Sequence, residues 1–163
     1  MSSDGLPPEE SPGVGAARRI VVDASVAVKW HLRDEANVPE ARKLLEHYAA
    51  GLVLLTAPAH IHYEVPSAIT VATRGRAPRL TFEQGREAID DFLALDIDLV
   101  HDEELIRAAY SLVHHYEVAF YDGLYLACAS QLDCSLVTAD RRFYQRISTL
   151  PRVVWIEDYP RVT

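Results

Sequence analysis

Short apolar runs alternate along this chain with longer segments in which apolar residues recur three and four positions apart. The runs, rich in β-branched residues and leucine, are predicted to be buried strands. The longer segments are predicted to be amphipathic helices. The predicted strands are residues 20–22, 52–55, 96–100, 135–137 and 153–156, and the predicted helices are residues 26–32, 38–50, 81–95, 102–116, 119–129 and 141–147.

One further helix is predicted to open at Pro58 and to run to Ala72, with Ile61, Val65 and Ile69 on its inward face. Pro66 falls inside this segment, where proline removes a hydrogen bond and crowds the preceding turn. We therefore expect a kink or a late helix start at Pro66.

Strands that alternate with helices indicate a parallel sheet covered on both faces, given right-handed crossovers. The predicted fold class is α/β, with a mainly parallel sheet of about five strands. Residues 1–17 are rich in Pro, Gly and Ser and are predicted to form a flexible tail, and residues 18–163 a single domain. Gly13-Val14-Gly15 precedes the first strand and lacks a third glycine, so it is not a dinucleotide-binding loop.

Composition narrows the function classes. The net charge of −8 argues against a protein that binds nucleic acid through bulk electrostatics, so any such contact must be local. No run reaches the roughly 20 apolar residues of a membrane span, and the acidic N-terminus does not resemble a secretory signal, which predicts the cytoplasm. The spacing of Cys128 and Cys134 matches neither a zinc ribbon nor a redox pair, which predicts buried thiols. Local basic clusters are Arg74, Arg76 and Arg79, and Arg141, Arg142 and Arg146.

Four acidic residues stand at positions where a catalytic or metal-binding side chain could lie. Asp23 and Asp140 follow the carboxyl ends of predicted strands, where open α/β sheets place their sites. Glu64 lies on the inward side of its helix, and Asp122 interrupts a helix that is otherwise almost entirely apolar. Helix capping is the structural alternative for Asp23 and Asp122. If the four converge, their mutual repulsion calls for a divalent cation.

The identity of that cation follows from the donor atoms. Carboxylate oxygens without cysteine favour Mg²⁺ or Mn²⁺ over Zn²⁺. His60 and His62 precede Glu64, but residues two apart point to different faces of a helix, which argues against a histidine metal site.

The motifs that carry these acids resemble those of the PIN domain, and most closely those of the VapC toxins of bacterial toxin–antitoxin pairs. The resemblance covers residues 20 to about 156. Its motifs are Val21-Val22-Asp23-Ala24-Ser25, Tyr63-Glu64-Val65, Tyr121-Asp122-Gly123-Leu124-Tyr125-Leu126-Ala127 and Thr138-Ala139-Asp140-Arg141-Arg142-Phe143.

This resemblance implies a PIN-like three-layer fold and a metal-dependent endoribonuclease that cuts single-stranded RNA, commonly tRNA or rRNA. It implies that Asp23, Glu64, Asp122 and Asp140 bind Mg²⁺ or Mn²⁺, and that Ser25 supports the site. Arginines at the rim would position the RNA backbone without reading its sequence. The candidates for this role are Arg74, Arg76, Arg141 and Arg142.

The resemblance also implies a cognate antitoxin and a homodimer. An antitoxin would place a basic side chain among the acids and an amphipathic helix in an apolar groove. Candidate groove residues are Trp30, Leu44, Leu45 and Tyr48, for which a core role is the alternative.

Two other functions remain open. A non-catalytic binding module would use the acids only as caps and ion-pair partners. A phosphatase of the haloacid dehalogenase type would require a second Asp at the position of Ser25.

Overall fold

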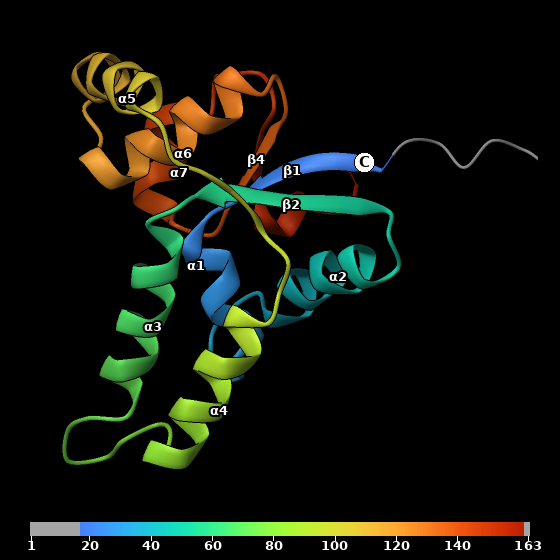
Figure 1. Cartoon of the computed structure of the whole chain (residues 1–163), viewed down its shortest axis with the longest axis vertical. Helices are drawn as coiled ribbons and strands as arrows, with labels where there is room; N and C mark the ends of the chain where they lie inside the picture. Colours follow the sequence, from blue (N-terminus) through green and yellow to red (C-terminus); the bar gives the residue numbers. More distant parts are fainter. Residues whose placement is uncertain (1–16, 162–163) are drawn as a thin grey trace, which may run out of the picture.

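The core of the fold is a five-stranded sheet in which every neighbouring pair of strands is parallel, in the order β3-β2-β1-β4-β5 (Figure 1). The structure is a computed structural model and describes residues 17–161. The predicted tail therefore lies outside the described residues, apart from Ala17. The strands are β1 (Arg18–Val22), β2 (Val53–Pro58), β3 (Asp98–Val100), β4 (Ser135–Thr138) and β5 (Val153–Trp155).

Helices cover both faces of this sheet, which confirms the predicted α/β three-layer class (Figure 1). The helices α1 to α4 lie below the sheet in this view, and α5, α6 and α7 lie above it, as right-handed crossovers from a central β1 require. Their bounds are α1 (Ala24–Ala27), α2 (Val38–Ala49), α3 (Ile61–Ala72), α4 (Phe82–Leu93), α5 (Glu103–Tyr116), α6 (Phe120–Gln131) and α7 (Arg141–Ile147), with 3-10 turns η1 (Val28–Trp30) and η2 (Ile156–Asp158).

The central strand β1 sets the position of the site. Ile20, Val21 and Val22 are completely buried, as expected for a strand covered on both faces. The chain continues from β1 to β2 on one side, and β4 lies on the other side. A parallel sheet opens a crevice at the carboxyl ends of its strands where the strand order reverses in this way. Asp23 stands at that point.

Helices α3 and α4 form an antiparallel pair that projects away from the sheet (Figure 1). Thr81 caps α4 with a full capping box, because its hydroxyl accepts from the Gln84 N–H while the Gln84 side chain accepts from the Thr81 N–H. At the far end of the pair, the loop of residues 73–81 carries Arg74, Arg76 and Arg79.

The structure corrects the sequence prediction around the two prolines. Pro58 ends β2 instead of opening a helix, and α3 begins three residues later. The predicted late helix start at Pro66 is wrong, because α3 already runs from Ile61 and continues through this residue. Pro66 is the sixth residue of α3, so the helix lacks the hydrogen bond that an N–H at this position would donate to the carbonyl of His62 and continues without it.

The predicted docking groove for an antitoxin is also wrong in part. Trp30 and Leu44 belong to the hydrophobic core, and Trp30 donates its indole N–H to the carbonyl of Ala41. Leu45 and Tyr48 are partly buried and pack against the same core. The core role, and not the groove, accounts for these four side chains.

Candidate active site

Asp23 lies immediately after β1 and is almost completely buried, with 4% of its surface exposed. Its Oδ2 accepts hydrogen bonds from Ser25 Oγ at 2.7 Å and from Thr138 Oγ1 at 2.6 Å. Burial raises the pKa of Asp23, although these two hydroxyls act in the opposite direction. Asp23 is also the N-cap of α1, so the capping alternative and the functional position coincide.

Asp140 reaches the same place from β4. Thr138 ends β4, and its hydroxyl accepts from the backbone N–H of Asp140 at 3.1 Å while donating to Asp23. The Oδ1 atom of Asp140 caps α7 by accepting from the N–H groups of Arg142 and Phe143. The Oδ2 atom of this carboxylate takes no part in the cap.

Glu64 comes from the first turn of α3 and is one-third exposed. Its Oε2 accepts a hydrogen bond of 2.6 Å from the hydroxyl of Tyr125 on α6. His60 Nε2 lies 3.1 Å from the same oxygen but without hydrogen-bond geometry. The sequence prediction that Glu64 borders the core is confirmed by this contact with a buried tyrosine.

Asp122 shows that the four carboxylates share one site. Its pKa is raised to about 7, first by burial and then by the negative charges of Asp23, Asp140 and Glu64. A hydrogen bond from the backbone of Ala119, the N-cap of α6, acts in the opposite direction. The charges of Asp23, Glu64 and Asp140 are therefore near enough to Asp122 to act on its pKa, as the predicted convergence requires.

The donor set has the chemistry of a hard-cation site. The donors are four carboxylates without a thiol, and part of their repulsion is visible in the raised pKa of Asp122. Among residues 17–161, however, no group of three or more His, Cys, Asp or Glu side chains is already placed to hold a metal ion. The residues fit Mg²⁺ or Mn²⁺ by their chemistry, and binding requires the side chains to draw closer or to share the ion with water.

A cavity of about 650 Å³ opens beside the acids. Glu64 and Asp140 line it from one side, and the exposed side chains of Arg141 and Arg142 stand at its rim, at the start of α7. Lys29 also lines the cavity; it is 7% exposed and lies 3.4 Å from Glu35. Negative and positive groups thus face one space large enough for part of an oligonucleotide.

Comparison with known proteins agrees with this geometry. The model of the PIN domain family matches residues 20–147, which contain all four acids. This chain belongs to the PIN domain family.

Its relatives within the family are VapC proteins. The chain is 32% identical to "Ribonuclease VapC12" of Mycobacterium tuberculosis over 126 residues, which cover 77% of this chain and 90% of the relative. Two solved structures share the fold. One is the sarcin-ricin loop cleaving toxin VapC20 of Mycobacterium tuberculosis, with a TM-score of 0.60 and 18% identity over 82% of this chain and 98% of that one. The other, a toxin-antitoxin complex from Klebsiella pneumoniae, has a TM-score of 0.59 and 15% identity over 83% and 95%.

Membership of the PIN domain family argues against the phosphatase alternative. That reading required a second acid two positions after Asp23. Ser25 occupies the position, and its hydroxyl supports Asp23 in the PIN domain by donating to Oδ2.

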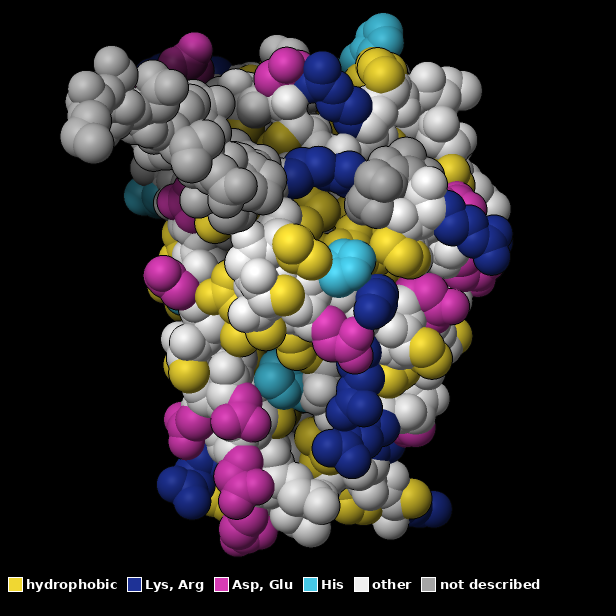
Figure 2. Space-filling view, turned by 90° about the vertical axis from the view of Figure 1, so that its right-hand side faces the viewer, with side chains coloured by type: hydrophobic (Ala, Val, Ile, Leu, Met, Phe, Trp, Pro, Cys, Tyr) yellow, Lys and Arg dark blue, Asp and Glu magenta, His cyan; other side chains and the backbone are white. Residues whose placement is uncertain are grey.

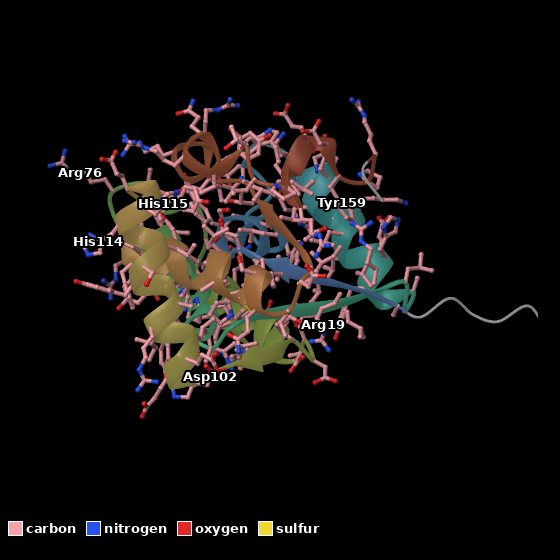
Figure 3. All side chains as sticks on the ribbon, turned by 90° about the horizontal axis from the view of Figure 1, so that it is seen from above. Arg19, Arg76, Asp102, His114, His115 and Tyr159 are labelled. Carbon is pink, nitrogen blue, oxygen red and sulfur yellow. The ribbon has the colours of Figure 1, made fainter. Side chains whose placement is uncertain are left out.

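The arginine candidates lie at different distances from the acids of this PIN domain. Arg141 and Arg142 are at the cavity, and Arg141 also stacks 5.0 Å over the ring of Trp155. Arg74 is ten residues beyond Glu64, roughly 15 Å along the helix axis at 1.5 Å per residue. Arg76 projects at the periphery of the molecule (Figure 3). The structure therefore groups only Arg141 and Arg142 with the acids.

Arg79, a member of the same basic cluster, has a structural role. Its guanidinium donates to Asp34 and to Glu35, at 2.5 Å and 2.7 Å. These contacts tie the loop after α3 to the segment that follows η1. Arg79 therefore belongs to a specific ion-pair network with Asp34 and Glu35.

Sequence reasoning did not assign a role to Thr138, Tyr125 or Lys29 in this PIN domain. Thr138 and Tyr125 stand inside the motifs, but a hydroxyl that contacts a carboxylate more than 60 positions away leaves no signal in local spacing. Lys29 offered a weak signal, since it is a charged residue in the apolar run before Trp30. The cysteine prediction is confirmed for Cys128, which is buried and free, while Cys134 is half-buried.

Proposed function

We propose that this protein is a divalent-metal-dependent endoribonuclease and the toxin of a toxin–antitoxin pair. The observation that carries the proposal is the pKa of about 7 at Asp122, which burial raises together with Asp23, Asp140 and Glu64. Four acids so close would be costly without a function that uses their charge. The names of the VapC relatives, which are ribonucleases, support RNA as the substrate.

Asp23, Glu64 and Asp122 are the proposed principal ligands of Mg²⁺ or Mn²⁺, and Asp140 completes the site directly or through water. When bound, the ion supplies the charge that activates a water and neutralises the phosphate and the leaving oxygen. The chain's own contribution is orientation. Glu64 and Asp140 each commit one carboxylate oxygen to a protein donor, which fixes the direction of the other oxygen. Asp23 is held at both oxygens, because Oδ1 accepts from the Ser25 N–H and Oδ2 from the Ser25 and Thr138 hydroxyls.

RNA is proposed to enter along the cavity beside the acids, with Arg141 and Arg142 holding the phosphate backbone. Arg74 and Arg76 could contact only a longer substrate that extends along α3. On the face that Figure 2 shows, acidic side chains stand beside the basic ones. Because the net charge of −8 repels RNA, binding requires a local group of cationic side chains at the rim of the cavity.

The partner of the toxin is proposed to be a small antitoxin whose basic side chain occupies the acidic site. The toxin-antitoxin complex from Klebsiella pneumoniae supports this pairing by its fold. A homodimer, a tRNA or rRNA substrate and a cytoplasmic location belong to the same proposal. None of the helices between residues 17 and 161 is long and apolar enough to cross a membrane.

The test is an RNA cleavage assay with purified protein in Mg²⁺ or Mn²⁺, comparing wild type with Asp23→Asn. Asp23→Asn removes one charge from the site and keeps the side-chain volume, so cleavage should be lost while the fold is retained. Asp90→Asn, an exposed aspartate on α4, is the matched control and should cleave as wild type does. Cleavage by Asp23→Asn at the wild-type rate would reject the assignment.

A non-catalytic binding module is the second candidate, favoured by the finding that no three acidic or histidine side chains among residues 17–161 are placed to hold an ion. This candidate predicts no Mn²⁺ binding by calorimetry and no cleavage of any single-stranded RNA. Binding of Mn²⁺ together with loss of cleavage in EDTA would exclude it.

A further inference from the structure

Tyr125 is a buried polar side chain for which the proposed chemistry has no direct use. It lies on α6 one turn beyond Asp122, and 1% of its surface is exposed. A buried hydroxyl is costly unless it finds a partner. Here the hydroxyl donates to Oε2 of Glu64 at 2.6 Å, across 61 positions of the chain. The partner that satisfies the Tyr125 hydroxyl is therefore Glu64, a proposed metal ligand.

Tyr125 can act only as a donor in this contact. Burial, followed by the charges of Asp23 and Glu64, raises the pKa of its hydroxyl well above the ordinary value, so the proton stays on the oxygen at neutral pH. The backbone of Ala24, next to Asp23, also hydrogen-bonds to this hydroxyl. One neutral group thus touches the segment after Asp23 and the Glu64 side chain, while its own helix carries Asp122.

The surroundings of Tyr125 restrict the Glu64 side chain further. The ring of His60 meets that of Tyr125 edge-on, with centroids 4.8 Å apart, and the ring of Tyr121 lies 5.2 Å from the other side of His60. This packing holds His60 Nε2 at 3.1 Å from Glu64 Oε2. A glutamate that is one-third exposed would otherwise sample several rotamers.

We infer that Tyr125 is a positioning residue, which holds Oε2 of Glu64 so that Oε1 is presented to the other three carboxylates. Tyr125 touches neither metal nor RNA. A carboxylate that is already oriented loses less conformational freedom when it binds an ion, so Tyr125 should increase metal affinity. This consequence rests on the proposed function, in which Glu64 is a metal ligand. Removal of such a supporting hydrogen bond typically weakens metal affinity by roughly 10- to 100-fold.

The test compares full-length wild type, Tyr125→Phe and Tyr159→Phe. Tyr159 is the matched control: 1% of its surface is exposed, as for Tyr125, and its hydroxyl lies 2.7 Å from Nδ1 of His47, a residue of α2, and contacts none of the four acids (Figure 3). Calorimetric titration with Mn²⁺, without RNA, should show affinity reduced roughly 10- to 100-fold in Tyr125→Phe and unchanged in Tyr159→Phe. In a Glu64→Ala background, which has no side-chain acceptor at position 64, Tyr125→Phe should have no further effect on affinity, because its influence passes through that acceptor.

A second measurement needs no metal. Side-chain NMR couplings of Glu64 should report one rotamer in wild type and averaging among several in Tyr125→Phe. A single unchanged rotamer in Tyr125→Phe would overturn the inference, whatever the metal titration gives. An equal loss of Mn²⁺ affinity in the Glu64→Ala background would also overturn it, since the effect would then be a general loss of structure. Failure of wild type to bind Mn²⁺ would reject the proposed function, and the NMR result would still decide the positioning contact.

Discussion

The hydroxyl of Thr138 donates to Oδ2 of Asp23 at 2.6 Å, joining two residues 115 positions apart at the carboxyl ends of neighbouring parallel strands. Thr138 is completely buried and Asp23 nearly so. The same hydroxyl accepts from the N–H of Asp140, so it connects the acids that follow β1 and β4. The contact supports a buried carboxylate that burial alone would drive towards protonation.

Thr138→Val should lower the free energy of unfolding by about 1–3 kcal/mol at pH 7, because it leaves a buried carboxylate and a backbone N–H each without one partner. Urea denaturation measures the change. Thr138→Ser keeps the hydroxyl and should cost about 0.8 kcal/mol, the value of one buried methyl group. Equal losses in the two variants would show that the hydrogen bond does not contribute.

The contribution of Asp122 to the stability of the metal-free protein should fall as pH rises from about 4 to about 7. His31, whose pKa burial lowers from its ordinary value of 6.5, acts in the opposite direction in the upper part of this window. The folded-state pKa of Asp122 is about 7, against an ordinary value of about 3.9, because burial and the three neighbouring acids disfavour its charged form. The folded state therefore binds more protons than the unfolded state across this window, and the free energy of unfolding decreases with rising pH. Asp23, whose pKa is also raised, acts in the same direction.

Urea denaturation in EDTA at several pH values measures this dependence. Asp122→Asn should flatten the curve between pH 4 and 7, and Asp90→Asn, on the exposed side of α4, should leave it unchanged. An Asp122→Asn variant with the same pH dependence as wild type would contradict the prediction.

Mn²⁺ should raise the melting temperature, since an ion that binds only the folded state stabilises it by about 2.7 kcal/mol at 100 times its dissociation constant. Differential scanning calorimetry with and without EDTA gives the shift. The shift should be much smaller in Asp23→Asn, which lacks one ligand charge. A wild-type melting temperature that Mn²⁺ leaves unchanged would argue for the binding-module alternative.

Gly123→Ala should destabilise the protein, because the new Cβ would lie 2.4 Å from Val113 Cγ2 and 3.3 Å from the carbonyl of Ala109. The overpacking cost of about 1–3 kcal/mol exceeds the gain of about 1 kcal/mol in helix propensity. The close contact of α5 with α6 also sets the place of Asp122, so cleavage should fall. The double variant with Val113→Ala, which removes the clashing methyl, should recover part of the stability measured by urea denaturation.

The sequence by itself determined the class of fold and the identity of the acids. β-branched strands buried on both faces, with helices between them, require a parallel sheet, and its carboxyl edge gathers whatever follows the strands. Asp23 and Asp140 could be placed there because strand ends are visible as the end of an apolar run. The inward side of α3 could be read from helical spacing, which located Glu64.

Tertiary structure alone decided how the acids are held. Whether Pro66 would break α3, which hydroxyls support each carboxylate, and which arginines stand near the site all depend on contacts between segments far apart in the chain. Tyr125 and Thr138 act through single atoms on partners 61 and 115 positions away, and spacing along one helix or strand carries no record of such a contact. Burial and the closeness of four charges, which together raise the pKa of Asp122 to about 7, arise only when the sheet assembles.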